Sequence, residues 1–193
     1  DILSEVIKNL VIRSKINPED IEDIIAGCAF PEGEQGFNIG KIVTFMTGMN
    51  INTAGMTVNR WCGSSMQSIH IAAGAIALGA GNAFICCGVE SMSRVPMNGF
   101  NPMPHPKLHE DNPNVYLSMG TTAENVAKRY QLTRNAQQDF AISSHVKAST
   151  AESNGYFKDE ITTINECSKD GGIRPNTTQE ILDGLKLAFD EDG

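Results

Sequence analysis

A long stretch almost without charge constrains the fold more than any other feature of the chain. Residues 42–89 include a single formally charged side chain, Arg60, whereas residues 92–193 carry 14 acidic and 10 basic side chains. A segment so poor in charge must bury much of its length, while the later part can remain solvated. The sequence therefore predicts two regions, a core-forming part over residues 1–92 and a loop region over residues 93–193.

Short apolar segments in the first part predict a layered α/β fold. Helical spacing of apolar residues predicts helices over residues 2–14, 39–47 and 63–78. Short apolar runs predict strands over residues 24–28, 56–58 and 83–89. Strands that alternate with helices favour a parallel sheet. The helix over residues 63–78 is apolar on most faces, so we expect it to be buried between layers, with His70 packed in the core.

Composition excludes several classes of function. With 15 Lys+Arg against 23 Asp+Glu the net charge is −8, so a nucleic-acid-binding role is disfavoured. The longest apolar stretch, over residues 69–80, is too short to span a membrane, which needs about 20 residues. The five cysteines include no CxxC pair, so no metal site is predicted. Free thiols indicate a reducing compartment, and we expect the cytoplasm, with mitochondria or peroxisomes as alternatives.

Cys62 is the main candidate for chemistry. It lies in the motif VNRWCGSS over residues 58–65, between a predicted strand and the apolar helix. Free N–H groups at a helix N-terminus favour a thiolate and can hydrogen-bond an oxyanion on an attached acyl group. Gly63 leaves the approach to the sulfur open. From this spacing alone, a reactive cysteine and a buried structural one remain equally open, since no histidine is placed to act as its base.

The motif around Cys62 closely resembles the thiolases. Further matching segments are Gly27-Cys28, GEQG over residues 33–36, CGVESMS over 87–93 and MGTTAENV over 119–126. Three later segments look most like the degradative 3-ketoacyl-CoA thiolases: GIRP over residues 172–175, Thr177-Thr178 and Leu185-Lys186. The resemblance implies a thiolase-type α/β half with a mixed sheet and a buried central helix, followed by a loop subdomain.

The resemblance also implies a reaction and its site. Thiolases cleave a 3-ketoacyl-CoA into acetyl-CoA and a shortened acyl-CoA, or run the reverse Claisen condensation, through an acyl-cysteine that Cys62 would form. Met119 matches a methionine of the acyl pocket, and Arg174 matches an arginine beside coenzyme A. Coenzyme A thioesters are substrates, and no cofactor is implied. Ser118 stands where biosynthetic acetoacetyl-CoA enzymes often have a histidine, which weakens the short-chain alternative.

One departure from the family pattern concerns the second half of the catalytic site. Thiolases use a later histidine and a second cysteine, and no matching Gly-His-Pro or Cys-x-Gly motif occurs here. Both ends of the chain look cut, so we expect an amino-terminal piece that is inactive alone. The family resemblance implies a homo-oligomer, a dimer or tetramer, through a strand near residues 54–58.

Two other interpretations stay open. The chain could belong to another thiolase-fold condensing enzyme. It could also be a non-enzymatic module that keeps the fold, although such a module has no need of the Cys62 nucleophile.

Overall fold

The computed structural model describes residues 1–192, which form two compact units. The first unit runs from Asp1 to Pro102 and the second begins at Met103. The first unit thus extends past residue 92, where the sequence placed the boundary. The added residues are held to it because the Phe100 N–H donates to the Glu32 carboxylate at 2.8 Å and Val95 is buried.

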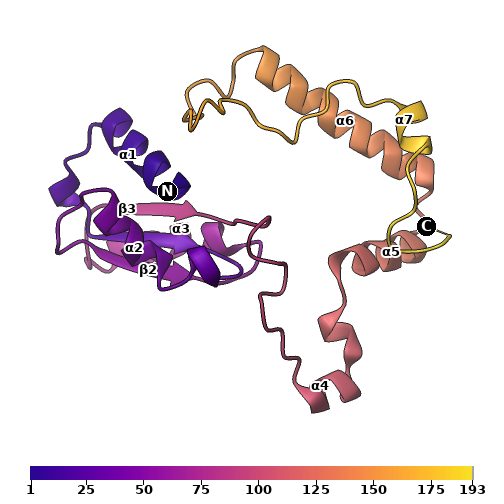
Figure 1. Ribbon diagram of the computed structural model, residues 1–193, viewed down its shortest axis with the longest axis horizontal. Coiled ribbons are helices and arrows are strands. Elements are labelled where there is room, and N and C mark those ends of the chain that lie inside the picture. The colour runs from indigo at the N-terminus through magenta and orange to yellow at the C-terminus, as the bar shows by residue number, and fades with distance from the viewer. Residues whose placement is uncertain (193) are drawn as a thin grey trace. The chain divides into compact units, whose positions relative to one another are not determined.

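The first unit alternates helices and strands as the sequence predicted. Its elements are α1 (Ile2–Ser14), β1 (Asp23–Gly27), α2 (Ile39–Met46), β2 (Ala54–Val58), α3 (Ser64–Ala77) and β3 (Phe84–Gly88) (Figure 1). The three strands form a sheet in the order β2-β1-β3, and both pairings are parallel. The mixed sheet that we expected is therefore not found among residues 1–192. Each strand reaches the next through a helix, and such a crossover connects parallel strands.

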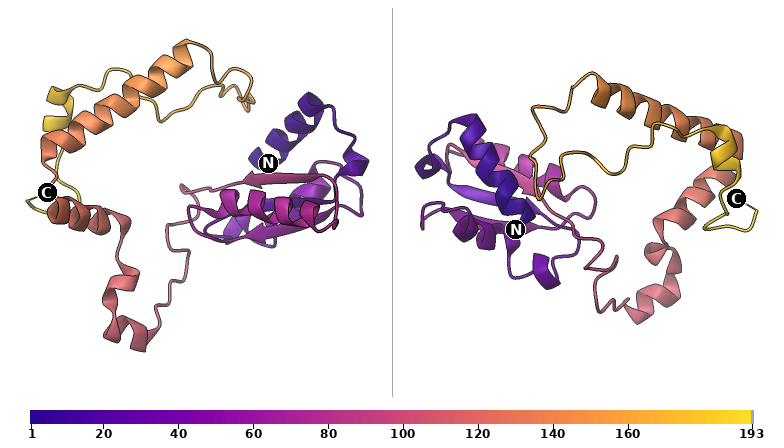
Figure 2. Two further views of the ribbon diagram at one scale, coloured as in Figure 1. Left: turned by 180° about the vertical axis from the view of Figure 1, so that it is seen from behind. Right: turned by 45° about the horizontal axis from the view of Figure 1, so that its top comes forward.

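The order of the strands places the helices on opposite faces of the sheet. The chain moves outward from β1 to β2 through α2, then back across β1 to β3 through α3 (Figure 2). Right-handed crossovers that run in opposite directions must use opposite faces. On one face, residues of α1 and α2 pack against β1 and β3, forming a core of Leu3, Ile7, Ile24, Ala26, Ile39, Val43 and Ile85. The other face of the sheet receives α3.

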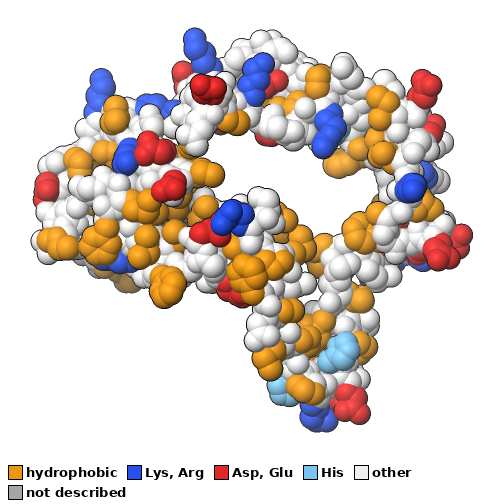
Figure 3. Space-filling view, in the orientation of Figure 1, with side chains coloured by type: hydrophobic (Ala, Val, Ile, Leu, Met, Phe, Trp, Pro, Cys, Tyr) orange, Lys and Arg blue, Asp and Glu red, His pale blue; other side chains and the backbone are white. Residues whose placement is uncertain are grey.

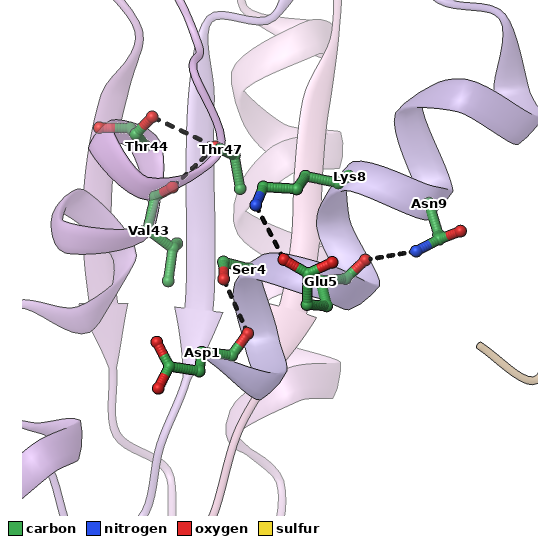
Figure 4. A network of polar contacts seen from close by, with 8 residues as sticks. All are labelled: Asp1, Ser4, Glu5, Lys8, Asn9, Val43, Thr44 and Thr47. Atoms are coloured by element: carbon green, nitrogen blue, oxygen red, sulfur yellow. Dashed lines mark hydrogen bonds and ion pairs between the residues drawn. The ribbon is translucent and has the colours of Figure 1, made fainter. Parts of the chain in front are cut away.

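Short-range polar contacts fix the ends of the helices on the first face (Figure 4). At the start of α1, Ser4 Oγ donates to the Asp1 carbonyl at 2.7 Å, and Lys8 pairs with Glu5 at 2.8 Å. At the end of α2, the Thr47 hydroxyl donates to the Val43 carbonyl at 2.7 Å. Both carbonyls also accept a backbone N–H of their own helix, that of Glu5 at 3.1 Å for Asp1 and that of Thr47 at 3.0 Å for Val43, so the contacts are local to each helix.

Helix α3 buries only one of its faces in this chain. Its buried residues, Ser64, Ser68 and Ala72, recur every four positions and face the sheet. Met66, Ile69 and Ile76 are half or more exposed. The prediction of a helix buried all round is thus wrong for the described residues. His70, expected in the core, is exposed because it lies off the buried stripe.

The second unit consists of helices joined by irregular segments. Its helices are α4 (Pro106–Asp111), α5 (Met119–Tyr130), α6 (Arg134–Ser153) and α7 (Gln179–Asp183). Helix α4 lies in a proline-rich part of residues 93–193, the region that the sequence predicted as loop. Pro106 occupies the first turn, where a helix tolerates proline, and His105 Nδ1 accepts the Leu108 N–H at 3.2 Å. These local contacts offset the helix-breaking character of the surrounding prolines.

Two glycines decide how closely α3 approaches the sheet. A Cβ added at Gly27 would lie 2.6 Å from the Ser64 carbonyl carbon, and one at Gly88 would overlap the Ser65 side chain. Gly27 and Gly88 are partners in the β1–β3 register. The first turn of α3 therefore rests directly on two adjacent strands at a point without side chains.

We predict that Gly27→Ala lowers the free energy of unfolding by about 2 kcal/mol, because the helix must move away from the sheet. Gly74→Ala is the matched control, since Gly74 lies within α3 with open space around it. There the added methyl should raise stability by about 0.5 to 1 kcal/mol through helix propensity. Urea unfolding of the intact protein that contains this chain measures both. Equal stabilities for the two variants would contradict the close approach.

Candidate active site

Cys62 lies in the tight connection between β2 and α3, and its side chain is exposed. Only Gly63, the N-cap residue, separates it from the first residue of the helix. The exposed sulfur thus stands beside the positive end of the helix dipole, as the sequence predicted. This arrangement has the character of a nucleophile elbow built with a thiol.

The residue before Cys62 holds an uncommon backbone conformation. Trp61 has φ of 50°, in the left-handed region that a bulky residue seldom adopts. Its N–H donates to Asn59 Oδ1 at 3.0 Å, and its carbonyl accepts the Ser64 hydroxyl at 2.5 Å. Its ring packs edge to face against the Phe30 ring, with 5.1 Å between the ring centroids. Several independent contacts therefore hold the turn that presents Cys62, as strained backbone at a functional site requires.

The backbone amides beside the sulfur are less free than the sequence suggested. The Gly63 N–H donates to the Arg60 carbonyl at 3.1 Å, and the Ser64 N–H donates to the Trp61 carbonyl at 3.0 Å. The turn uses these two donors to close itself, so they are not available to an oxyanion in this structure. Gly63 itself has an ordinary φ of −89°, and a Cβ there would meet the Arg60 carbonyl oxygen only at 3.4 Å. The backbone at position 63 would therefore accept a residue with a side chain. Glycine there serves to keep the approach to Cys62 open.

The topology of the sheet explains why a site can form at this edge. The segment after β1 leads to α2 on one face, while the segment after β2 leads through Cys62 to α3 on the other. The carboxyl ends of the strands are the usual ligand edge of an open parallel sheet. Cys62 follows the carboxyl end of β2 and therefore lies at this edge.

Three residues that sequence reasoning did not assign to the site tie together the segments at this edge. Glu90 follows β3, Gln35 belongs to a short 3-10 turn (Gly33–Gln35), and Asn59 follows β2. Gln35 is buried and its side-chain oxygen accepts the Ser91 N–H at 2.7 Å. Asn59 Nδ2 donates to the Ala29 carbonyl at 2.9 Å. The only sequence signal for them was their place inside the matching motifs.

The other cysteines of the first unit are packing residues. Cys28 is buried, and desolvation together with the nearby Glu90 carboxylate raises the pKa of its thiol to about 11. Burial raises the pKa of the Cys87 thiol to about 12, with a smaller contribution from Cys86. Burial also raises the pKa of Cys86. Neutral, desolvated thiols of this kind are poor nucleophiles.

The remaining candidate residues lie in the second unit, which is described by itself. Met119 is exposed and begins α5, which Ser118 caps by accepting the Thr121 N–H at 3.1 Å. Arg174 is exposed on an irregular segment, and its backbone N–H donates to His145 Nδ1 at 3.2 Å. The contact with His145 of α6 was not foreseen from the sequence. The roles of Met119 and Arg174 in substrate binding stay predictions.

Residues 1–192 contain neither a metal-binding cluster nor a membrane-spanning helix. No group of three or more His, Cys, Asp or Glu side chains in this part of the chain is arranged to hold a metal ion. None of the helices described here has the length and apolar character needed to cross a membrane.

These features define a layered α/β domain of the thiolase type that presents an exposed cysteine at a strand-to-helix turn. A family model described as "Thiolase, N-terminal domain" matches residues 1–193. The chain therefore belongs to the thiolase family, as its amino-terminal domain.

Curated relatives and a solved structure agree with this assignment. The chain is 41% identical over 210 residues to the 3-ketoacyl-CoA thiolase of Bacillus subtilis, covering 100% of this chain and 54% of that protein. It is 41% identical over 197 residues to the 3-ketoacyl-CoA thiolase of Shewanella frigidimarina, covering 97% and 51%. The structure of human mitochondrial 3-ketoacyl-CoA thiolase in complex with CoA matches with a TM-score of 0.84 at 28% identity, covering 98% and 52%. The chain thus spans about half the length of the relatives it matches.

We predict that iodoacetamide at pH 8 alkylates Cys62 and Cys167, the two exposed thiols, while Cys28 and Cys87 stay unmodified. With pKa values of about 11 and 12, only about one in a thousand of these buried thiols, or fewer, is ionised at that pH. Peptide mass spectrometry reads the result. The same treatment in urea is the control and should label all five cysteines. Modification of Cys28 in the folded protein would contradict the packing role.

Proposed function

We propose that this chain supplies the nucleophile half of a 3-ketoacyl-CoA thiolase. The observation that carries the proposal is the exposed Cys62 in the turn that leads into the N-terminus of α3, at the carboxyl edge of a parallel sheet. The names of the relatives supply the substrate class, 3-ketoacyl thioesters of coenzyme A. Free thiols throughout the described chain fit a reducing compartment such as the cytoplasm.

In the proposed reaction, the Cys62 thiolate attacks the keto carbon of the substrate. The bond between the keto carbon and the α-carbon of the thioester breaks. Acetyl-CoA then leaves as an enolate that takes up a proton. The acyl group stays on the sulfur as a thioester until the thiol of a second coenzyme A attacks it. This step returns the cysteine and releases a shortened acyl-CoA, so that one side chain both receives and gives up the acyl group.

The remaining half of the relatives' length is needed for this chemistry. Within residues 1–192 the site offers a nucleophile, but no histidine takes part in the hydrogen bonds of the turn that carries Cys62. The exposed side chains Met66, Ile69 and Ile76 of α3 also form an apolar face that a second layer would bury. Several hydrophobic side chains are likewise exposed on the face of the first unit seen in Figure 3. We therefore expect the chain alone to be inactive.

An oligomer through β2 forms part of the same proposal. Strand β2 pairs with β1 on one side only, so it is an edge of the described sheet. An edge strand presents unpaired N–H and C=O groups that another strand can complete. A second copy of the chain paired along Ala54–Val58 would satisfy these groups.

The decisive test is the intact mass of the protein after incubation with acetoacetyl-CoA. We expect an acetyl adduct on Cys62 in the intact protein that contains this chain. The Cys62→Ala variant should show none. Cys167→Ala is the matched control, because Cys167 is also exposed but lies outside the motif. An adduct that survives Cys62→Ala, or its absence from the unsubstituted protein, would refute the proposal and favour a non-enzymatic module.

A further inference from the structure

The Glu90 carboxylate collects hydrogen bonds from the segment that follows β1. It accepts the Ala29 N–H at 2.7 Å, the Phe30 N–H at 3.3 Å and the Gln35 side-chain amide at 2.6 Å. The Cys28 thiol adds a weaker contact at 3.7 Å. Hydrogen bonds to an ionised carboxylate are about twice as strong as neutral ones. Glu90, although exposed as a residue, therefore fixes the position of this segment relative to β3.

The same segment in turn holds the residues that precede Cys62. The Ala29 peptide gives its N–H to Glu90, and its carbonyl accepts Asn59 Nδ2 at 2.9 Å. Asn59 Oδ1 accepts the Trp61 N–H at 3.0 Å. The neighbouring Phe30 ring packs edge to face on the Trp61 ring. A continuous series of contacts thus joins the Glu90 carboxylate to the residue directly before the sulfur.

We infer that Glu90 is a positioning residue for Cys62, acting through the Ala29 peptide and Asn59. It does not touch the sulfur in the described contacts. Its carboxylate holds the segment after β1, which keeps Trp61 in its left-handed conformation and aims Cys62 along the N-terminus of α3. The inference rests on the proposed role of Cys62 as the nucleophile.

The carboxylate is suited to this role in a way that its amide is not. All of the groups that point at Glu90 are donors, and a glutamine there would place its own NH₂ among them. Glu90→Gln keeps the volume of the side chain but loses the charge and one acceptor. The nearby Glu32 offers a matched control, because its carboxylate accepts a backbone N–H, that of Phe100, at 2.8 Å without joining the contacts to Trp61.

The test is the rate at which iodoacetamide alkylates Cys62 at pH 7 in the intact protein, read by peptide mass spectrometry. We expect Glu90→Gln to slow alkylation about fivefold, because the turn no longer holds Cys62 beside the N-terminus of α3. Glu32→Gln should leave the rate within about twofold of the unsubstituted protein. Both variants remove one negative charge from the same edge of the sheet, so a loss confined to Glu90→Gln identifies positioning.

Each outcome has one meaning. An unchanged or faster rate in folded Glu90→Gln, with folding checked by its thermal unfolding midpoint, overturns the inference. If that variant does not fold, Asn59→Ala breaks the next link and must show the same loss, otherwise the inference fails. If Cys62 of the unsubstituted protein reacts no faster than Cys167, the proposed function fails instead.

Discussion

The close approach of α3 to the sheet at Gly27 and Gly88 is the constraint on which the rest of the first unit depends. A helix can lie this near two strands only where neither presents a side chain. The approach fixes the first turn of α3, and with it the short connection from β2 that carries Cys62. It also explains why the buried stripe of the helix consists of small residues: Ser64, Ser68 and Ala72.

The site is built by the segments that leave the carboxyl ends of the three strands. These segments have little regular secondary structure, so side-chain hydrogen bonds join them in place of the backbone hydrogen bonds of a sheet. Glu90 ties the segment after β3 to the one after β1, and Asn59 ties that segment to the one after β2. Polar networks of this kind hold a functional group in one geometry when every member is satisfied. Cys62, the proposed nucleophile, is therefore held by residues from all three strand ends.

Much of the fold could be predicted because the first unit follows a simple physical pattern. Helical spacing located α1, and short apolar runs located β1 and β3, to within one or two residues at each end. The prediction that α3 is buried on all sides was wrong for residues 1–192. The helix is apolar on most faces, but the described residues cover only the face that packs on the sheet. Helix α4 was missed because its N-cap contact from His105 is local and specific, whereas the prolines around it are a general signal for loop.

The sequence by itself determined the order of helices and strands in the first unit and, through the resemblance, the family and the candidate nucleophile. Periodicity and turn chemistry are properties of neighbours in the chain, and so they can be read from it. Only the tertiary structure decided that the strands take the order β2-β1-β3, that the amides of Gly63 and Ser64 are engaged, and that Glu90 reaches Ala29. The sheet order and the Glu90 contact join residues far apart in the sequence, and their partners are chosen by packing across the sheet. The amides of Gly63 and Ser64 bond to carbonyls only three residues earlier, in a turn that depends on the left-handed conformation of Trp61.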